Sequence, residues 1–268
     1  MTRIKLTGVP ETMLWTLHNR AAEAAKPNGF LKDPDCVRIY QSIDYDFVGS
    51  FGPPDGSHPL RSKLFDHVVV PWCAAHPGGT VVELGAGLET QFQRVDDGRV
   101  RWLCVDVPEA IEVRERFLPP TDRCRSVKKS ALDLTWLDEV DPASPTFVSA
   151  QGLLMYFQPD EVRHLFTTIV ERLPGVELLF DTIPHWFSRK TLAGYQKTPG
   201  YRAPPMPWAV NPNELAPLLR SWNERVTEVT TGGSGYPRTL SGLTLRLFAA
   251  LPMLRALTPT IAHVRTRS

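Results

Sequence analysis

Several features that mark particular classes of protein are missing from this chain. Thirty Lys and Arg residues against 29 Asp and Glu residues give a net charge of +1, so the basic excess of a nucleic-acid-binding protein is absent. No apolar run is long enough to span a bilayer, and the first residues, MTRIKLTGVPETM, contain no apolar signal-peptide core. We therefore expect a cytoplasmic protein without nucleic-acid or membrane partners. Its oligomeric state stays open.

Cysteine is also scarce. The four cysteines are spread along the chain and show no C-x-x-C spacing, so neither a zinc site nor a disulfide framework is indicated. What the chain does have is length and apolar content. Its 268 residues, of which 42% are hydrophobic, suffice for a sizeable core. We expect a single domain over residues 1–268.

Short apolar runs alternate with amphipathic segments through most of the chain. We expect strands at residues 80–84, 100–107, 123–130, 146–150, 176–183, 225–230 and 261–266. We expect helices at residues 11–25, 59–75, 109–117, 159–172, 213–220 and 239–257. This alternation predicts a Rossmann-like α/β fold, with a mostly parallel sheet and helices on both faces. Residues 1–57 and 184–212 depart from it, and we expect them to form a helical and irregular cap.

A glycine turn follows the first of these strands in the stretch TVVELGAGLET. Gly85 and Gly87 allow a tight bend and let a ligand approach the backbone. Asp106 ends the next strand 19 residues after Gly87, where Rossmann-type sites hold a ribose diol. The third glycine of a dinucleotide site is replaced by Thr90, which disfavours NAD. S-adenosylmethionine, which has ribose and adenine but no phosphate, fits better than NAD, while a plain tight turn is the structural alternative.

Four segments in order carry a family resemblance. They are VVELGAGLET, VRWLCVDVPEAIEVRERFLP, SALDLTW and VSAQGLLMYFQPDEVRHLF. Together they resemble class I S-adenosylmethionine-dependent methyltransferases and, more narrowly, the leucine carboxyl methyltransferase family, which includes bacterial polyketide O-methyltransferases. The resemblance extends over about residues 11–183 and is weak elsewhere. It implies S-adenosylmethionine as cofactor and O-methyl transfer as reaction.

The resemblance also implies which residues bind the cofactor. Gly85 and its neighbours Glu83, Ala86 and Gly87 would pass under the methionine moiety, and Asp106, followed by Val107, would hold the ribose. Asp133 and Leu134 would meet the adenine, although Asp133 could instead favour the dipole of a following helical turn.

Three further cofactor residues follow from the same resemblance. Arg61 would bind the cofactor's carboxylate, although an arginine on an amphipathic helix is often simply solvated. Gln151, next to Gly152, stands where many members have Glu, and it can still hydrogen-bond the cofactor's amine without the charge. Glu89 stands where the family often has Asp.

The cap insertion has an unusual composition. Residues 182–213 hold five aromatics where about three are expected, four basic residues and no acid. Such a segment suits a flat, anionic, apolar substrate, unless its aromatics only pack on the core. We therefore expect Trp186, Tyr195, Tyr201 and Trp208 to bind the substrate, a small molecule. Arg20, in HNRAAEA, resembles a basic residue near the family's N-terminus and is a fifth candidate.

The chemistry of the acceptor separates the possible reactions. A carboxylic acid, with a pKa of about 4, is ionised at pH 7, whereas deprotonating a phenol costs about 4 kcal/mol. We expect methylation of a carboxylate on a small, apolar, aromatic natural product, which needs no base. The alternatives are a phenol, with a base, and a protein C-terminal carboxylate, which would need an open groove.

Two residues are candidates for a catalytic role. His185 follows the strand at 176–183 and is the best candidate base for a phenol. Tyr156 flanks the ligand end of the strand at 146–150, although it could merely pack there. His18 and His58 could reach the site only if their segments fold over it. A protein that binds the ligand without catalysis would use the same binding residues.

Overall fold

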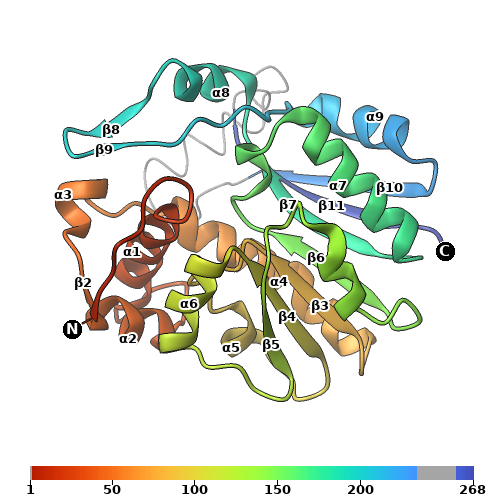
Figure 1. Ribbon diagram of the computed structural model, residues 1–268, viewed down its shortest axis with the longest axis horizontal. Helices are drawn as coiled ribbons and strands as arrows, with labels where there is room; N and C mark the ends of the chain where they lie inside the picture. Colours follow the sequence, from red (N-terminus) through yellow and green to blue (C-terminus); the bar gives the residue numbers. More distant parts are fainter. Residues whose placement is uncertain (1, 234–257) are drawn as a thin grey trace.

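The computed structural model describes residues 2–233 and 258–268. A seven-stranded sheet forms its centre (Figure 1). In sheet order the strands are β10 (Val226–Gly233), β11 (Thr260–Thr266), β7 (Glu177–Thr182), β6 (Thr146–Ala150), β3 (Thr80–Leu84), β4 (Arg101–Asp106) and β5 (Cys124–Lys128). The five strands from β7 to β5 are parallel, and β11 runs antiparallel to both β7 and β10.

Helices cover both faces of the sheet because its central strands are apolar on both sides. In β3, Val81 packs against α4 and α5, while its neighbour Val82 packs on the opposite face with α7 and α9. These helices and the remaining ones of the sheet region are α4 (Ser57–Ala75), α5 (Gln91–Val95), α6 (Pro108–Phe117), η1 (Leu134–Glu139), η2 (Leu154–Tyr156), α7 (Pro159–Arg172) and α9 (Pro212–Trp222). Buried strands with helices on both sides are the pattern of a Rossmann-like α/β fold.

Local sequence signals explain where these helices begin. Pro108, Pro159 and Pro212 each occupy the first turn of a helix, where no backbone donor is needed. In α7, the side chains of Gln158 and Glu161 form a capping box. Because of these signals, the boundaries predicted for α6 and α7 agree with those in the structure to within one residue.

Most apolar residues of the N-terminal cap segment pack in one cluster, together with residues of α6 and with Tyr201 and Ala203 of the cap insertion. The elements of the cap are β1 (Thr2–Arg3), α1 (Thr12–Ala24), α2 (Pro34–Ser42), β2 (Ile43–Asp44), α3 (Phe47–Phe51), α8 (His185–Leu192), β8 (Gln196–Thr198) and β9 (Tyr201–Arg202). In Figure 1 the β8–β9 hairpin reaches from α8 back to α3. The Thr198 hydroxyl donates a 2.6 Å hydrogen bond to the carbonyl of Ser50. The two cap segments therefore contact each other directly.

Most of the predicted architecture is confirmed, with limited differences. The expected strands and helices are present wherever the structure describes them. The helix expected at residues 239–257 lies outside the described residues. Local signals in the sequence did not predict α2, α3, α8 or the β8–β9 hairpin. Within the described ranges, no helix has both the length and the apolar character needed to cross a membrane.

Candidate active site

Two cavities meet at the carboxyl ends of the parallel strands. The glycine-loop cavity, about 220 Å³, lies against the turns that follow β3, β4 and β6. The cap cavity, about 410 Å³, lies between the sheet, α1, the start of α4 and the cap insertion. Five residues line both cavities: Thr12, Thr16, Arg61, Gly152 and Tyr156. Two ligands, one bound in each cavity, would therefore contact each other at this shared boundary, as two reacting molecules must.

The glycine loop is shaped by its two glycines. Gly85 and Gly87 have positive φ angles of 65° and 41°. A Cβ atom on either would come within 2.9 Å of a neighbouring side chain, Leu153 or Met13. Only glycine fits both the backbone conformation and the space, so the loop backbone forms one wall of the cavity.

Asp106 faces this loop from the end of β4. Its carboxylate accepts hydrogen bonds of 2.8 Å from the backbone amides of Gly87 and Val107. Burial raises the pKa of Asp106, and the two amides act in the opposite direction. The carboxylate lines the glycine-loop cavity, which places an acceptor for hydroxyl hydrogen bonds at its edge.

Two buried arginines hold the carbonyl oxygens of the loop. Arg114, from α6, donates to the carbonyls of Gly87 (3.0 Å) and Glu89 (2.6 Å). Arg20, from α1, donates to the carbonyl of Leu88 (2.7 Å) and to the carboxylate of Glu89 (2.9 Å). Both side chains are almost fully buried. Their charge-assisted hydrogen bonds fix the path of the backbone behind the cavity.

Glu89 is the centre of a buried ion-pair network. Burial alone would raise its pKa, but Arg20 and Arg94 outweigh burial and lower it to about 2. Arg94 also pairs with Asp33 (2.8 Å) and Asp66 (2.9 Å). The network therefore joins α1, α2, α4 and α5 beneath the glycine loop.

Three polar atoms in the glycine-loop cavity have no hydrogen-bond partner among the residues that the structure describes. Both amide atoms of Gln151 and the Oε1 atom of Glu83 are buried and form no hydrogen bond within the described part of the chain. Burial, followed by the nearby Cys104, raises the pKa of Glu83 to about 8. Buried polar groups are normally satisfied, so these atoms suit a polar ligand.

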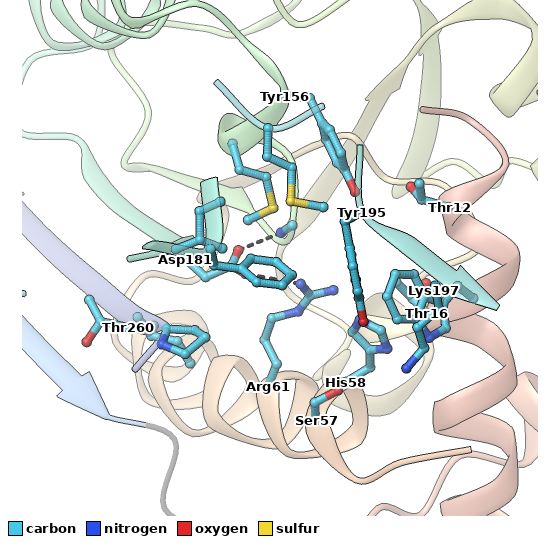
Figure 2. A pocket seen from close by; sticks show the side chains of 18 residues that line it. Thr12, Thr16, Ser57, His58, Arg61, Tyr156, Asp181, Tyr195, Lys197 and Thr260 are labelled. Atoms are coloured by element: carbon cyan, nitrogen blue, oxygen red, sulfur yellow. Dashed lines mark hydrogen bonds and ion pairs between the residues drawn. The ribbon is translucent and has the colours of Figure 1, made fainter. Parts of the chain in front are cut away.

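Arg61 lies at the boundary between the two cavities and pairs with Asp181 of the cap cavity (Figure 2). Nη1 of Arg61 lies 3.0 Å from Oδ2 of Asp181, whose other oxygen accepts a hydrogen bond from the backbone amide of Gly152. A Cβ atom at residue 152 would lie 2.5 Å from Arg61, so the guanidinium crosses directly over this glycine. Nε of Arg61 has no partner among the described residues.

The cap cavity has a mainly apolar lining with cations at its edge. Its apolar and aromatic wall consists of Trp15, Met155, Tyr156, Ile183, Phe187, Tyr195, Met206 and Ile261. Nζ of Lys197 lies 5.0 Å from the ring centre of Trp15 and forms no ion pair within the described ranges. Burial raises the pKa of Tyr156 to about 12, so its hydroxyl stays protonated.

One histidine, His58, lines the cap cavity. Its imidazole lies at the start of α4, edge-on to Trp15 with 5.5 Å between ring centres. Burial and the positive charge of Arg61 lower the pKa of His58 to about 3, and Asp55 opposes them. The ring is therefore neutral at pH 7.

Most of the predicted site residues come together around these cavities. The glycine-loop cavity is lined by Glu83, Gly85, Ala86, Gly87, Asp106, Val107, Gln151 and Gly152. Arg61 and Tyr156 line both cavities, and Tyr195 lines the cap cavity. Gly152 has a φ of 65°, which accounts for a glycine at that position.

Asp133 and Leu134 are not among the residues that line either described cavity. Asp133 is exposed and caps η1, where it accepts hydrogen bonds from the amide and hydroxyl of Thr135. This is the helix-terminal alternative considered for it above. Ser130 and Ala131 line the glycine-loop cavity instead.

The structure also places His185 and Arg20 outside both cavities. His185 is 45% exposed, and its Nε2 atom lies 2.8 Å from the Glu214 carboxylate. Ile183 and Phe187 on either side of it line the cap cavity, but the His185 side chain is directed to Glu214 of α9 instead, so following the strand does not bring this histidine to the ligand side. Arg20 contacts the back of the glycine loop through Leu88 and Glu89 rather than a substrate.

Three of the aromatic candidates lie away from the cavity lining. Trp208 is buried against the sheet, 6.1 Å between ring centres from Phe180. Tyr201 packs in the cap at 4.8 Å from Phe51, and Trp186 is largely exposed. Trp208 and Tyr201 therefore pack in the interior and do not line the cap cavity. Only the arrangement of α8 and the hairpin distinguishes them from Tyr195.

Several residues of the site were not predicted from the sequence. Trp15 and Asp181 line the cap cavity but were not predicted as site residues, and Lys197 was noted only as one of the four basic residues of the cap insertion. His58 was considered only on condition that its segment folds over the site, and it does so. Asp181, in the strand motif LLFDT, was the most accessible of these signals because an acid in an otherwise apolar strand needs a partner.

Comparisons with known proteins find relatives of this chain. The model of the leucine carboxyl methyltransferase family matches residues 54–170. The tetracenomycin polyketide synthesis O-methyltransferase TcmP of Streptomyces glaucescens is 32% identical over 189 residues, covering 69% of this chain and 70% of that protein. The S-adenosyl-L-methionine-dependent methyltransferase dpfgK of Gibberella zeae is 28% identical over 202 residues, covering 67% of each.

A solved structure shows the same fold. The N-methyltransferase NodS from Bradyrhizobium japonicum WM9 superposes with a TM-score of 0.51 at 12% identity, over 79% of this chain and 99% of that one. At this identity the likeness concerns the fold alone.

Proposed function

This chain belongs to the leucine carboxyl methyltransferase family and is an S-adenosylmethionine-dependent methyltransferase, and we propose that it methylates a carboxylate on a small, apolar, aromatic acceptor. The observation that carries this proposal is the cap cavity. Its wall is apolar and aromatic, and Arg61 and Lys197 lie at its edge. Such a lining suits an apolar body with one anionic group.

The glycine-loop cavity has the groups that the cofactor needs. The amide of Gln151 and the Oε1 atom of Glu83 lack hydrogen-bond partners in residues 2–233 and 258–268, and Gly85 and Gly87 leave room for close approach. We propose that Asp106 holds the ribose hydroxyls and that Gln151 and Arg61 meet the amino-acid part. Bound there, S-adenosylmethionine supplies an electrophilic methyl group. The chain's own residues position it toward the shared boundary of the two cavities.

The same residues favour a carboxylate over a phenol. A carboxylate is already ionised at pH 7, so the chain needs only to hold it in line with the methyl group and exclude water. His58 is a poor base at a pKa of about 3, and Tyr156 remains protonated. His185 is directed to Glu214 outside the cavities. No strong base among the described residues lines the cap cavity.

A matched pair of acceptors tests the proposal. The protein is incubated with S-adenosylmethionine and either 1-naphthoate or 1-naphthol, which share a ring system and differ in the acceptor group. We expect a methyl ester from the acid, identified by mass spectrometry and by its hydrolysis in mild alkali, which leaves an aryl ether intact. Turnover of the naphthol alone would contradict a carboxylate acceptor. Heat-denatured protein controls for uncatalysed methylation.

A further inference from the structure

The hydrogen bonds behind His58 determine which of its ring nitrogens carries the proton. Nδ1 of His58 lies 2.9 Å from Nδ2 of Asn19, on the neighbouring helix α1. The ring itself lines the cap cavity, on the side where Figure 2 also places Tyr195 and Lys197. An imidazole nitrogen can donate or accept, so the orientation of the Asn19 amide decides the tautomer.

Two contacts with Asp55 fix that orientation. The backbone N–H of Asp55 donates to Oδ1 of Asn19 at 3.2 Å, and a backbone N–H can only donate. The carboxylate of Asp55 accepts from Nδ2 of Asn19 at 3.0 Å, and an ionised carboxylate can only accept. Both contacts would be lost if the amide were flipped. The amide nitrogen of Asn19 therefore faces His58.

The tautomer of His58 follows directly. An amide nitrogen has hydrogens to donate and accepts none, so Nδ1 of His58 must be the acceptor. The charged groups that act on the ring are Asp55, which favours the imidazolium, and Arg61, Arg20 and Lys197, which disfavour it. The cations and burial prevail, so the ring is neutral and its single N–H is at Nε2. No group in residues 2–233 or 258–268 forms a hydrogen bond with that Nε2.

We propose that His58 is a specificity-determining residue that donates a hydrogen bond from Nε2 to the anionic oxygen of the methyl acceptor, and that it does not act as a base. The inference rests on the proposed carboxylate methylation and deepens it. A donor whose lone pair is occupied by Asn19 attracts an oxygen anion but cannot remove a proton from a neutral hydroxyl. Asn19 is then a positioning residue, since it acts only through His58.

Nitrogen NMR tests the tautomer without any turnover. Long-range ¹H–¹⁵N spectra of the ¹⁵N-labelled full chain at pH 7 distinguish a protonated from an unprotonated ring nitrogen. The His58→Gln spectrum assigns the signals by subtraction. We expect Nε2 protonated and Nδ1 bare, and in Asn19→Leu we expect this preference to weaken. A His58 signal with a proton on Nδ1, alone or together with Nε2, would overturn the proposal.

Matched substitutions then test the donor. His58→Gln keeps an N–H donor near the position of Nε2, whereas His58→Leu removes it. A hydrogen bond to a charged group predicts that kcat/KM for 1-naphthoate falls about 10-fold to 100-fold in His58→Leu and only a few-fold in His58→Gln. His67→Leu and His67→Gln, at an exposed histidine on the same helix, are the controls. Equal losses in both His58 variants, or none in His58→Leu, would refute the donor.

Binding separates this proposal from the proposed function. Calorimetric titration of 1-naphthoate in the presence of S-adenosylhomocysteine needs the donor but no methyl transfer. Binding that survives His58→Gln and is lost in His58→Leu supports the donor even if the wild-type chain forms no ester. This binding pattern without ester formation would refute carboxylate methylation but not the hydrogen-bond donor. If 1-naphthoate binds His58→Leu as tightly as it binds the wild-type chain, His58 is not the donor, and carboxylate methylation is unaffected by that result.

Discussion

The two cavities are adjacent, yet their walls are held in place by different forces. Behind the glycine-loop cavity, Arg20, Arg94 and Arg114 form charge-assisted hydrogen bonds with loop carbonyls and carboxylates. Around the cap cavity, aromatic rings pack on each other, as Phe187 does on Tyr195 at 5.8 Å between ring centres. Hydrogen bonds demand defined distances and angles, whereas apolar packing tolerates substitution when volume is kept.

This difference indicates a division of tasks. The cofactor is always the same molecule, and a directional polar network gives its cavity one geometry. The acceptor cavity needs only shape, apolar surface and a place for one anion. We therefore expect substitutions behind the glycine loop to affect stability and cofactor binding, and substitutions in the apolar wall of the cap cavity to affect the acceptor alone.

The largest effect is expected at Arg114. Replacing it with Met leaves loop carbonyls buried without donors, which predicts a loss of about 3–5 kcal/mol in the free energy of unfolding. Urea denaturation measures the loss, and cofactor affinity should fall with it. Arg125→Met is the control, because this arginine is exposed and pairs weakly with Glu139 at 3.3 Å. A loss at Arg114 no greater than at Arg125 would break the comparison.

The next effect concerns the two aspartates that the resemblance assigned to the cofactor. Asp106→Asn keeps the shape but removes the charge that faces the glycine-loop cavity, so S-adenosylmethionine should bind about 30-fold to 100-fold more weakly. Asp133→Asn alters only the N-terminal cap of η1, so the affinity of this variant for S-adenosylmethionine should stay within about twofold of the wild-type value. Isothermal titration calorimetry compares them. A similar loss of S-adenosylmethionine affinity in both variants would indicate that Asp133 binds the adenine after all.

Glu83 should make stability depend on pH. Burial raises its pKa to about 8 in the folded protein, from about 4.5 when unfolded, so the folded state binds a proton that the unfolded state lacks. Its contribution is complete below about pH 4.5 and is lost as the pH rises through 8, by at most about 1.4 kcal/mol per pH unit. In Glu83→Gln the fall in unfolding free energy between pH 6 and 8 should be shallower. Parallel slopes from urea titrations would contradict this.

The smallest effect is expected at Lys197. Its ammonium group lies at the edge of the cap cavity without an ion pair in the described part of the chain, so Lys197→Met should raise the KM for an acidic acceptor about 3-fold to 10-fold. Cofactor affinity should not change. Lys63→Met, at an exposed lysine on α4, is the matched control. A weaker cofactor affinity in Lys197→Met would show that the two cavities are not independent.

The fold could be predicted from the sequence to the extent that its signals are local. The apolar run of β3 and the proline and capping box of α7 locate these elements almost to the residue. Strand direction is not a local property, so nothing in the sequence of β11 indicated that it runs antiparallel to β7. The cap depended on contacts such as Thr198 with Ser50, which are 148 residues apart.

The site residues, too, could be predicted from the sequence only where the signal is local. The glycine loop and Asp106 could be found because a turn and its carboxylate have a fixed spacing. His185 was preferred over His58 because it follows a strand, but α8 directs it toward Glu214. His58 reaches the cap cavity only because α1 and α4 pack together, which no motif encodes. A charged residue such as Arg20 also gave no sign of whether it faces a ligand or a buried carboxylate.

The apolar wall of the cap cavity has a consequence for protein engineering. Trp15 comes from the N-terminal cap segment and Phe187, Tyr195 and Met206 from the cap insertion, and their side chains form no hydrogen bond within the described residues. A combinatorial library restricted to these four positions would alter the volume and outline of the cavity while leaving the arginine network intact. New acceptors could then be selected from variants that all retain the ability to fold and to load the methyl donor.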